Sequence, residues 1–188
     1  MNSFKKLDWV HNQLQLAKKP NFWSILEYGD GAEYSAHEIR TSRMIRWLMD
    51  ANETHQVGNL FAQKLMQSVQ PNYEHDVQKN KAIQTTAEYE NIDVFYRDLS
   101  QRLCIAIEVK QHAKEGKTSD NRSQLDKYED IVKKWKVEKG GDIQDYYIFL
   151  TPLKTEPTNA NWRAVGYEEF IEVIEEFVAE MERLNPPN

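Results

Sequence analysis

The stretch LCIAIEVK, residues 103–110, decides the fold of this chain of 188 residues. Its apolar side chains stand at alternate positions, as they do on one face of a β-strand: Leu103, Ile105, Ile107 and Val109. The other face carries two small residues and then two charges: Cys104, Ala106, Glu108 and Lys110. A buried charge is costly unless it is paired, hydrogen-bonded or bound to a metal ion. The pattern predicts a central strand that is closely covered on one face and ends in a functional cleft.

The segment before this strand supplies a second carboxylate. NIDVFYRD, residues 91–98, has β-forming composition with Asp93 among apolar neighbours, and residues 97–102 can turn the chain into a hairpin. Such a hairpin brings Asp93 alongside Glu108, where two carboxylates repel each other unless a cation lies between them. Oxygen ligands favour Mg²⁺ or Mn²⁺ over zinc. A protonated Lys110 is no ligand, but it can orient water or neutralise charge on a phosphate.

Hydrophobic periodicity places further helices and strands around this hairpin. It predicts helices over about 4–16, 35–49, 59–69, 120–138 and 167–184, and strands over 82–90, 145–152 and 161–166. Ser119 or Asp120 is the expected N-cap of the fourth helix. Strands interleaved with helices predict an α/β protein around a mixed sheet of four to five strands, with an N-terminal helical extension.

Composition narrows the possible functions. The net charge of −6 and pI near 5.4 argue against nucleic-acid binding through bulk charge, although carboxylates that hold metal ions also make a total negative. Cys104 is the only cysteine and fits a small core residue, so no intramolecular disulfide or thiolate zinc site can form. Gly-rich phosphate loops, G-x-G-x-x-G and G-x-S-x-G are absent, and the histidines lack metal-ligand spacing. Without a membrane-length apolar run, we expect a cytoplasmic protein with no membrane partner.

The arrangement NID…EVK resembles the signature of the PD-(D/E)XK nuclease superfamily, with Ile92 where the superfamily's name has proline. SQLDKYEDIV resembles a helix that carries a glutamine and a tyrosine in many members, here Gln124 and Tyr128 on one helical face. The stretch HEIRTSRMIRWLMDANETHQVGNLF resembles one uncharacterised, restriction-endonuclease-like branch at Glu38, Trp47, Leu48, Asp50, Asn52, His55 and Gly58. The closing YIFLTPLKTEP and VGYEEFIEVI resemble the last strand and helix of that branch.

The resemblance implies a restriction-endonuclease-like α/β/α core and metal-dependent hydrolysis of phosphodiester bonds, with DNA favoured over RNA. Asp93, Glu108 and the backbone carbonyl of Val109 would hold Mg²⁺ or Mn²⁺, and Lys110 would position the attacking water. Gln124 and Glu38 would shape the site. We expect one domain over 1–188, with a mostly helical part at 1–70, including a first core helix at about 35–50, and a nuclease core at 80–183.

Several of these residues also have a simpler interpretation. Gln124 can merely cap the apolar stripe of its helix, and Tyr128 fits the core better than the site. Glu38 can be an acid favoured by a helix N-terminus. Glu88 and Glu90 lie just before the Asp93 strand and are further candidates for the metals. The alternative function is a catalytically inert module that binds nucleic acid or a protein partner in a restriction or anti-phage assembly. For a nuclease, a homodimer or a larger assembly is also considered, because cutting both strands needs two sites or a rebinding step.

Overall fold

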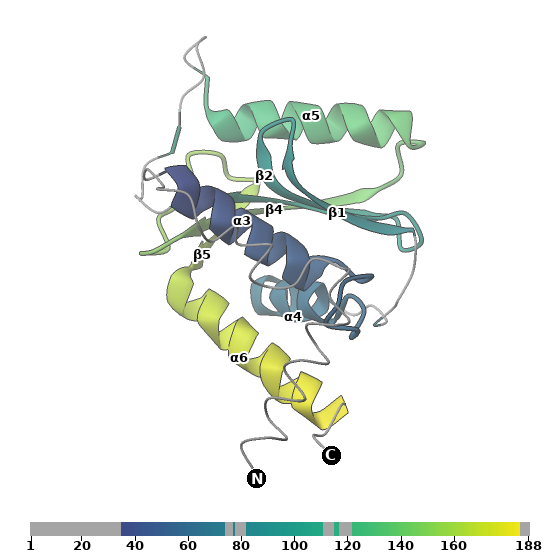
Figure 1. Ribbon diagram of the computed structural model, residues 1–188. Coiled ribbons are helices and arrows are strands. Elements are labelled where there is room, and N and C mark those ends of the chain that lie inside the picture. The colour runs from purple at the N-terminus through teal and green to yellow at the C-terminus, as the bar shows by residue number, and fades with distance from the viewer. Residues whose placement is uncertain (1–34, 74–76, 78–81, 111–114, 117–121, 185–188) are drawn as a thin grey trace, which may run out of the picture.

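The computed structural model describes residues 35–73, 77, 82–110, 115–116 and 122–184, and the helix expected at 4–16 lies outside them (Figure 1). The described helices are α3 (Ser35–Met49), α4 (Leu60–Val69), α5 (Gln124–Glu138) and α6 (Tyr167–Leu184). The strands are β1 (Ile83–Tyr89), β2 (Ile92–Asp98), β3 (Leu103–Val109), β4 (Gln144–Thr151) and β5 (Trp162–Gly166). Within the described ranges, no helix has the length and apolar character that crossing a membrane requires.

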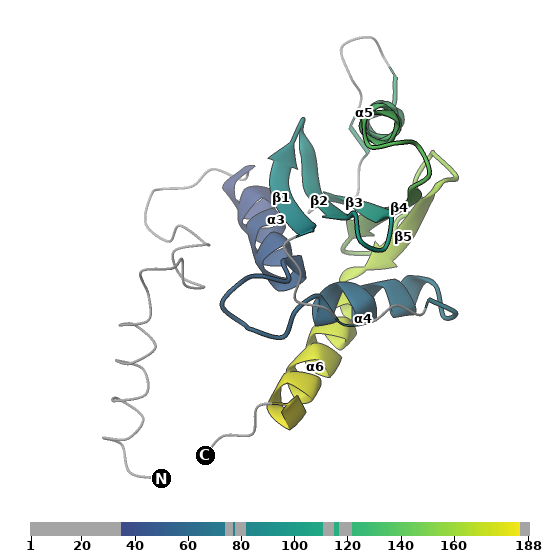
Figure 2. The same cartoon turned by 90° about the vertical axis from the view of Figure 1, so that its right-hand side faces the viewer.

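The five strands form one mixed sheet in the order β1-β2-β3-β4-β5. The first three are joined as antiparallel hairpins, whereas β3, β4 and β5 run parallel. Helix α5 covers one face of the sheet, and α3, α4 and α6 lie on the other (Figures 1 and 2). The protein therefore has the predicted α/β architecture, and β3 is its central strand.

The two faces of β3 differ as the alternation of its residues predicts. Its larger side chains, from Leu103 to Val109, pack into the core beneath α3, α4 and α6. Cys104 and Ala106 face α5 and contact a second core that includes Leu125 and Tyr128. Small side chains on this face let the helix approach the strand closely, and all seven strand residues are buried. The prediction that Cys104 is a core residue is confirmed.

The start of α5 differs from the prediction. The helix begins at Gln124, and the side chain of Ser123 caps it by accepting a hydrogen bond of 3.1 Å from the Leu125 N–H. The N–H of Gln124 donates to the carbonyl of Gly116 at 3.1 Å, so the chain is tied back to residue 116 where the helix starts. The prediction of Ser119 or Asp120 as the N-cap was wrong, because polar residues in series do not show which one ends the preceding loop.

Candidate active site

Asp93 and Glu108 meet across the β2–β3 hairpin at the carboxyl end of β3. The register pairs Val94 with Ile107, so the next pair outward sets Asp93 opposite Glu108. Asp93 is held in place by the main chain, because its Oδ2 accepts a hydrogen bond of 2.7 Å from the Val109 N–H. The hairpin prediction is confirmed, and it brings the two acidic residues together as expected.

Glu108 is the most unusual group of the site. Its residue is 0 % exposed, and within the described part of the chain the Lys110 ammonium is the one N–H donor to its carboxylate. The Nζ of Lys110 forms an ion pair with Oε1. The Lys110 side chain is 16 % exposed, so the pair extends from the interior to the surface. A buried carboxylate with so few partners is costly to keep ionised.

The electrostatics of the site favour bound positive charge. Burial raises the pKa of Glu108, the nearby charge of Asp93 raises it further, and Lys110 only partly offsets both. Burial also raises the pKa of Asp93, against the lowering effects of the Val109 N–H and Lys110. Burial is the largest cause of both shifts, because a carboxylate removed from water is costly to ionise without a cation. The site is thus arranged to take up either a proton or a metal ion.

The residues present fit a hard divalent cation. Two carboxylates supply oxygen ligands, and among the described residues Lys110 is the one N–H donor to Glu108. Among the described residues, no cluster of three or more acidic, histidine or cysteine side chains forms a metal site. Mg²⁺ usually binds through one or two protein carboxylates together with water and substrate phosphate, so two suffice. The Val109 carbonyl as a ligand remains a prediction.

Helix α5 places Gln124 and Tyr128 above this end of the sheet. The Gln124 Nε2 donates a hydrogen bond to the Tyr128 hydroxyl, so the two predicted residues do share one helical face. Tyr128 is buried in the core, and the charges of Glu108 and Asp93 act on its hydroxyl, whose pKa is raised mainly by burial. A Cβ at Gly116 would clash with the Gln124 Oε1, which makes glycine necessary for this side-chain position.

The other acidic candidates lie at different places. Glu88 faces the position of Asp93 in the β1–β2 register, and its charge adds to the effect of burial in raising the pKa of Asp93. Its φ of 58° is unusual for a non-glycine residue. Glu90 belongs with Asn91 to the two-residue turn between the strands, where both have positive φ. Glu38 lies in α3, but its side chain is outside the described residues.

The residues of the branch motif serve packing in the α3–α4 connection. The Trp47 Nε1 donates to the Thr54 Oγ1 at 3.1 Å, and the Asn52 Nδ2 donates to the Ile83 carbonyl at 3.3 Å. His55 is buried and bonded at both ring nitrogens, to the Trp47 carbonyl and the Val57 N–H. Burial lowers its pKa, which favours the neutral ring. This motif joins α3, α4 and β1 and supplies no described side chain to the Glu108 site.

One contact at the site was missed by the sequence predictions. The Tyr167 hydroxyl, at the first position of α6, donates a hydrogen bond of 3.0 Å to the carbonyl of Lys110. The two residues are 57 positions apart, and Tyr167 otherwise looks like an ordinary aromatic residue at the start of an amphipathic helix. No local pattern distinguishes it, so only the tertiary structure could have found it.

Comparison with known families agrees with this geometry. The family model described as the PD-(D/E)XK nuclease superfamily matches residues 21–186, which include every described helix and strand. The chain belongs to this superfamily, and membership indicates a nuclease. No curated protein and no solved structure matched the chain.

Proposed function

We propose that the protein is a metal-dependent nuclease that hydrolyses phosphodiester bonds, most favourably those of DNA, with Asp93, Glu108 and Lys110 at its centre. The observation that carries the proposal is the burial of Glu108 and the small number of its partners. It is wholly buried, faces a second carboxylate and, among the described residues, has the Lys110 ammonium as its one N–H donor. Such perturbed groups cluster at functional sites. Superfamily membership supports the same activity.

Each residue has a role that its contacts support. Asp93, fixed by the Val109 N–H, and Glu108 would hold Mg²⁺ or Mn²⁺, with the Val109 carbonyl as a further ligand. When bound, such an ion polarises the phosphate and lowers the pKa of a coordinated water. Lys110 keeps a positive charge at the strand end, where it orients the attacking water and offsets charge that develops on the phosphate.

Gln124 completes the site on the helix side. Its amide is held by Tyr128 and by the space that Gly116 leaves, so it offers a fixed hydrogen-bonding group at the N-terminus of α5. Polar groups held in advance stabilise the transition state without reorganisation. Glu38 stays in the proposal as an acid on α3 that would shape the site. A homodimer would bring two such sites to the two strands of a duplex.

The proposal is tested by cleavage of supercoiled plasmid, linear duplex, single-stranded DNA and RNA, each with Mg²⁺, Mn²⁺ or EDTA. The wild type is compared with Asp93→Asn and Lys110→Met, and circular dichroism verifies the fold. Lys136→Met is the matched control, because Lys136, in the last turn of α5, forms an ion pair with Asp145 at the start of β4, away from the Glu108 site. We expect metal-dependent cleavage that falls at least about a hundredfold in both site variants and persists in the control.

Two outcomes would contradict the nuclease proposal. Equal cleavage by the wild type and both site variants would assign the activity to a contaminant or to other residues. If the wild type cleaves none of the four substrates with either ion, the inert binding module becomes the better description. Binding of the same substrates without cleavage would then identify its ligand.

A further inference from the structure

Two hydrogen bonds hold the main chain of Lys110, the residue that follows β3. Its N–H donates to the Leu150 carbonyl of β4 at 2.9 Å, and its carbonyl accepts the Tyr167 hydroxyl at 3.0 Å. The parallel pairing of β3 with β4 ends at the Val109–Leu150 pair. The Tyr167 hydrogen bond therefore holds the backbone one residue beyond the end of β3. That residue is Lys110, the lysine of the proposed reaction.

This control matters because lysine is a long and flexible side chain. Its ammonium reaches Glu108 through four carbons that rotate freely, so its position depends on where the Cα–Cβ bond starts. The ψ angle of Lys110 sets the direction of its carbonyl. A displacement of about 1 Å at a catalytic group can cost a large part of the rate. A hydrogen bond to that carbonyl holds the backbone in one orientation.

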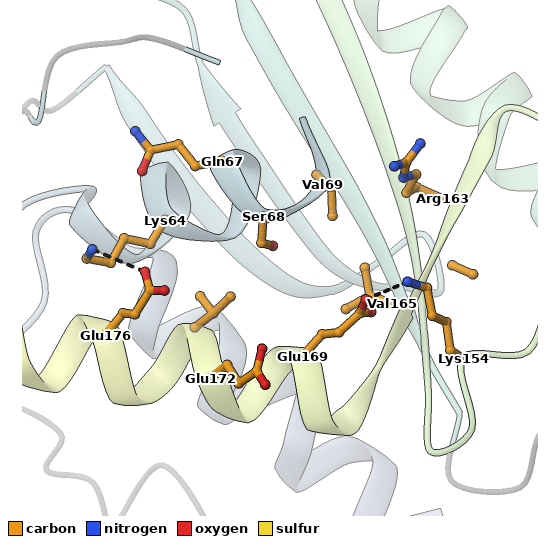
Figure 3. Close-up of a pocket in the computed structure, with 12 residues that line it drawn as sticks. Lys64, Gln67, Ser68, Val69, Lys154, Arg163, Val165, Glu169, Glu172 and Glu176 are labelled. Carbon is orange, nitrogen blue, oxygen red and sulfur yellow. Dashed lines mark hydrogen bonds and ion pairs between the residues drawn. The ribbon is translucent and has the colours of Figure 1, made fainter. Parts of the chain in front are cut away.

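The first turn of α6, which carries Tyr167, is itself held firmly. The Glu169 Oε2 accepts the Gly166 N–H at 3.0 Å, and its Oε1 pairs with the Lys154 Nζ at 2.5 Å. A Cβ at Gly166 would lie 3.3 Å from the Lys154 Cβ, so the segment that follows β4 packs closely against the end of β5. Figure 3 shows this Lys154–Glu169 pair at one end of a groove of about 310 Å³ between α4, β5 and α6.

We propose that Tyr167 is a positioning residue for Lys110: its hydroxyl, mounted on the clamped first turn of α6, fixes the backbone from which the Lys110 ammonium reaches Glu108. The inference rests on the proposed nuclease function. Tyr167 acts through the Lys110 carbonyl and takes no part in holding the metal ion. Its ring packs against the core on the α6 side of the sheet, so the hydroxyl is the group to remove.

The test is Tyr167→Phe, with Tyr146→Phe as the matched control. Tyr146 also packs against this core, in an edge-on contact with Tyr73. We expect Tyr167→Phe to lower kcat roughly tenfold, to leave KM for DNA within about twofold, and to leave Mn²⁺ affinity, measured by calorimetry without DNA, unchanged. The control should match the wild type in all three. An unchanged kcat, or equal losses in both variants, would overturn the inference while the nuclease stands.

A double-mutant cycle identifies the residue through which Tyr167 acts. In a Lys110→Ala background, Tyr167→Phe should cause no further loss of kcat, because the side chain it positions is gone. An independent tenfold loss there would show that Tyr167 works through another group. Sensitive detection of residual cleavage is required, since the background variant is slow.

Hydrogen exchange gives a readout that needs no cleavage. Tyr167→Phe should speed exchange at the Lys110 amide while the amides inside β3 keep their protection. Unchanged exchange at Lys110 would contradict the clamp directly. If exchange changes as expected but the wild type cleaves no nucleic acid, Tyr167 does hold the Lys110 backbone. The nuclease proposal then fails, and with it the catalytic role of this hydrogen bond.

Discussion

The layer between α5 and the sheet contains a lysine–carboxylate pair at each end, and the two pairs differ in the burial and in the partners of the carboxylate. At the start of β4, both oxygens of Asp145 are bonded, one to the Lys136 Nζ at 2.5 Å and the other to the Tyr147 hydroxyl at 2.7 Å. At the end of β3, Glu108 has Lys110 as its one N–H donor among the described residues, and it faces Asp93 in place of a second donor.

The pKa values of the two carboxyl groups move in opposite directions. Burial disfavours the ionised form of Asp145, but the bonds from Lys136 and Tyr147 outweigh it and lower its pKa. Burial and the charge of Asp93 raise the pKa of Glu108. A lysine–carboxylate pair therefore stabilises the fold where its partners are complete, and under our proposal its carboxylate binds a metal ion where they are not.

The largest effect is expected from Glu108→Gln. The substitution removes a proposed metal ligand, so cleavage should fall by at least about a thousandfold, measured as plasmid nicking with Mg²⁺. Retained cleavage would show that Glu108 has no role in the reaction and that the Glu108–Lys110 pair is structural, like the Lys136–Asp145 pair.

Glu108→Gln should also change the dependence of stability on pH. A carboxyl whose folded pKa lies above its unfolded value costs stability as the pH rises, because the unfolded chain ionises more readily. In EDTA, the variant should therefore gain in Tm relative to the wild type as the pH rises above about 4.5, the ordinary pKa of glutamate. A difference in Tm that stays constant with pH would contradict the raised pKa.

Divalent metal should stabilise the wild type through Asp93 and Glu108 and not through Asp145. An ion that binds only the folded protein adds about 2.7 kcal/mol to the free energy of unfolding at a hundred times its Kd. Melting curves with increasing Mn²⁺ should show this gain in the wild type and in Asp145→Asn, and lose it in Asp93→Asn. A gain that Asp93→Asn retains would locate the metal elsewhere.

Asp145→Asn should have the opposite profile to Glu108→Gln. It weakens two hydrogen bonds of a satisfied pair, which we expect to lower the free energy of unfolding by about 1–3 kcal/mol with cleavage almost unchanged. The wild-type contribution should be present above pH about 4 and vanish as the pH falls below it, because the pKa of Asp145 is lowered. Urea unfolding of the wild type and Asp145→Asn at pH 7 and at pH 3 measures the loss in free energy of unfolding and its dependence on pH.

The smallest effect is expected from Gly116→Ala, which tests the helix side of the site. The added Cβ meets the far end of the Gln124 side chain, which can move aside at little cost in stability. Its contact with Tyr128 should then be lost, and cleavage should fall several-fold, as in Gln124→Ala. If Gln124→Ala leaves the rate unchanged, Gln124 belongs to the core stripe and not to the site.

The comparison also shows what sequence can predict here. Alternation within residues 103–110 and the hairpin spacing to Asp93 sufficed for the central strand, its two faces and the meeting of Asp93 with Glu108. The Val109 N–H that holds Asp93 and the Tyr167 contact to Lys110 were missed, because both depend on positions that only the tertiary structure brings together. The start of α5 was misplaced for a similar reason, its tie to Gly116. The division into parts at 1–70 and 80–183 stays a prediction.

The most direct test is the rate of Mg²⁺-dependent plasmid nicking by Glu108→Gln and Asp145→Asn, measured side by side with the wild type on folded protein. Our account predicts that Asp145→Asn cuts at nearly the wild-type rate and that Glu108→Gln does not cut detectably. Equal rates for the two variants, at any level, would contradict the claim that Glu108, at the end of β3, belongs to the active site.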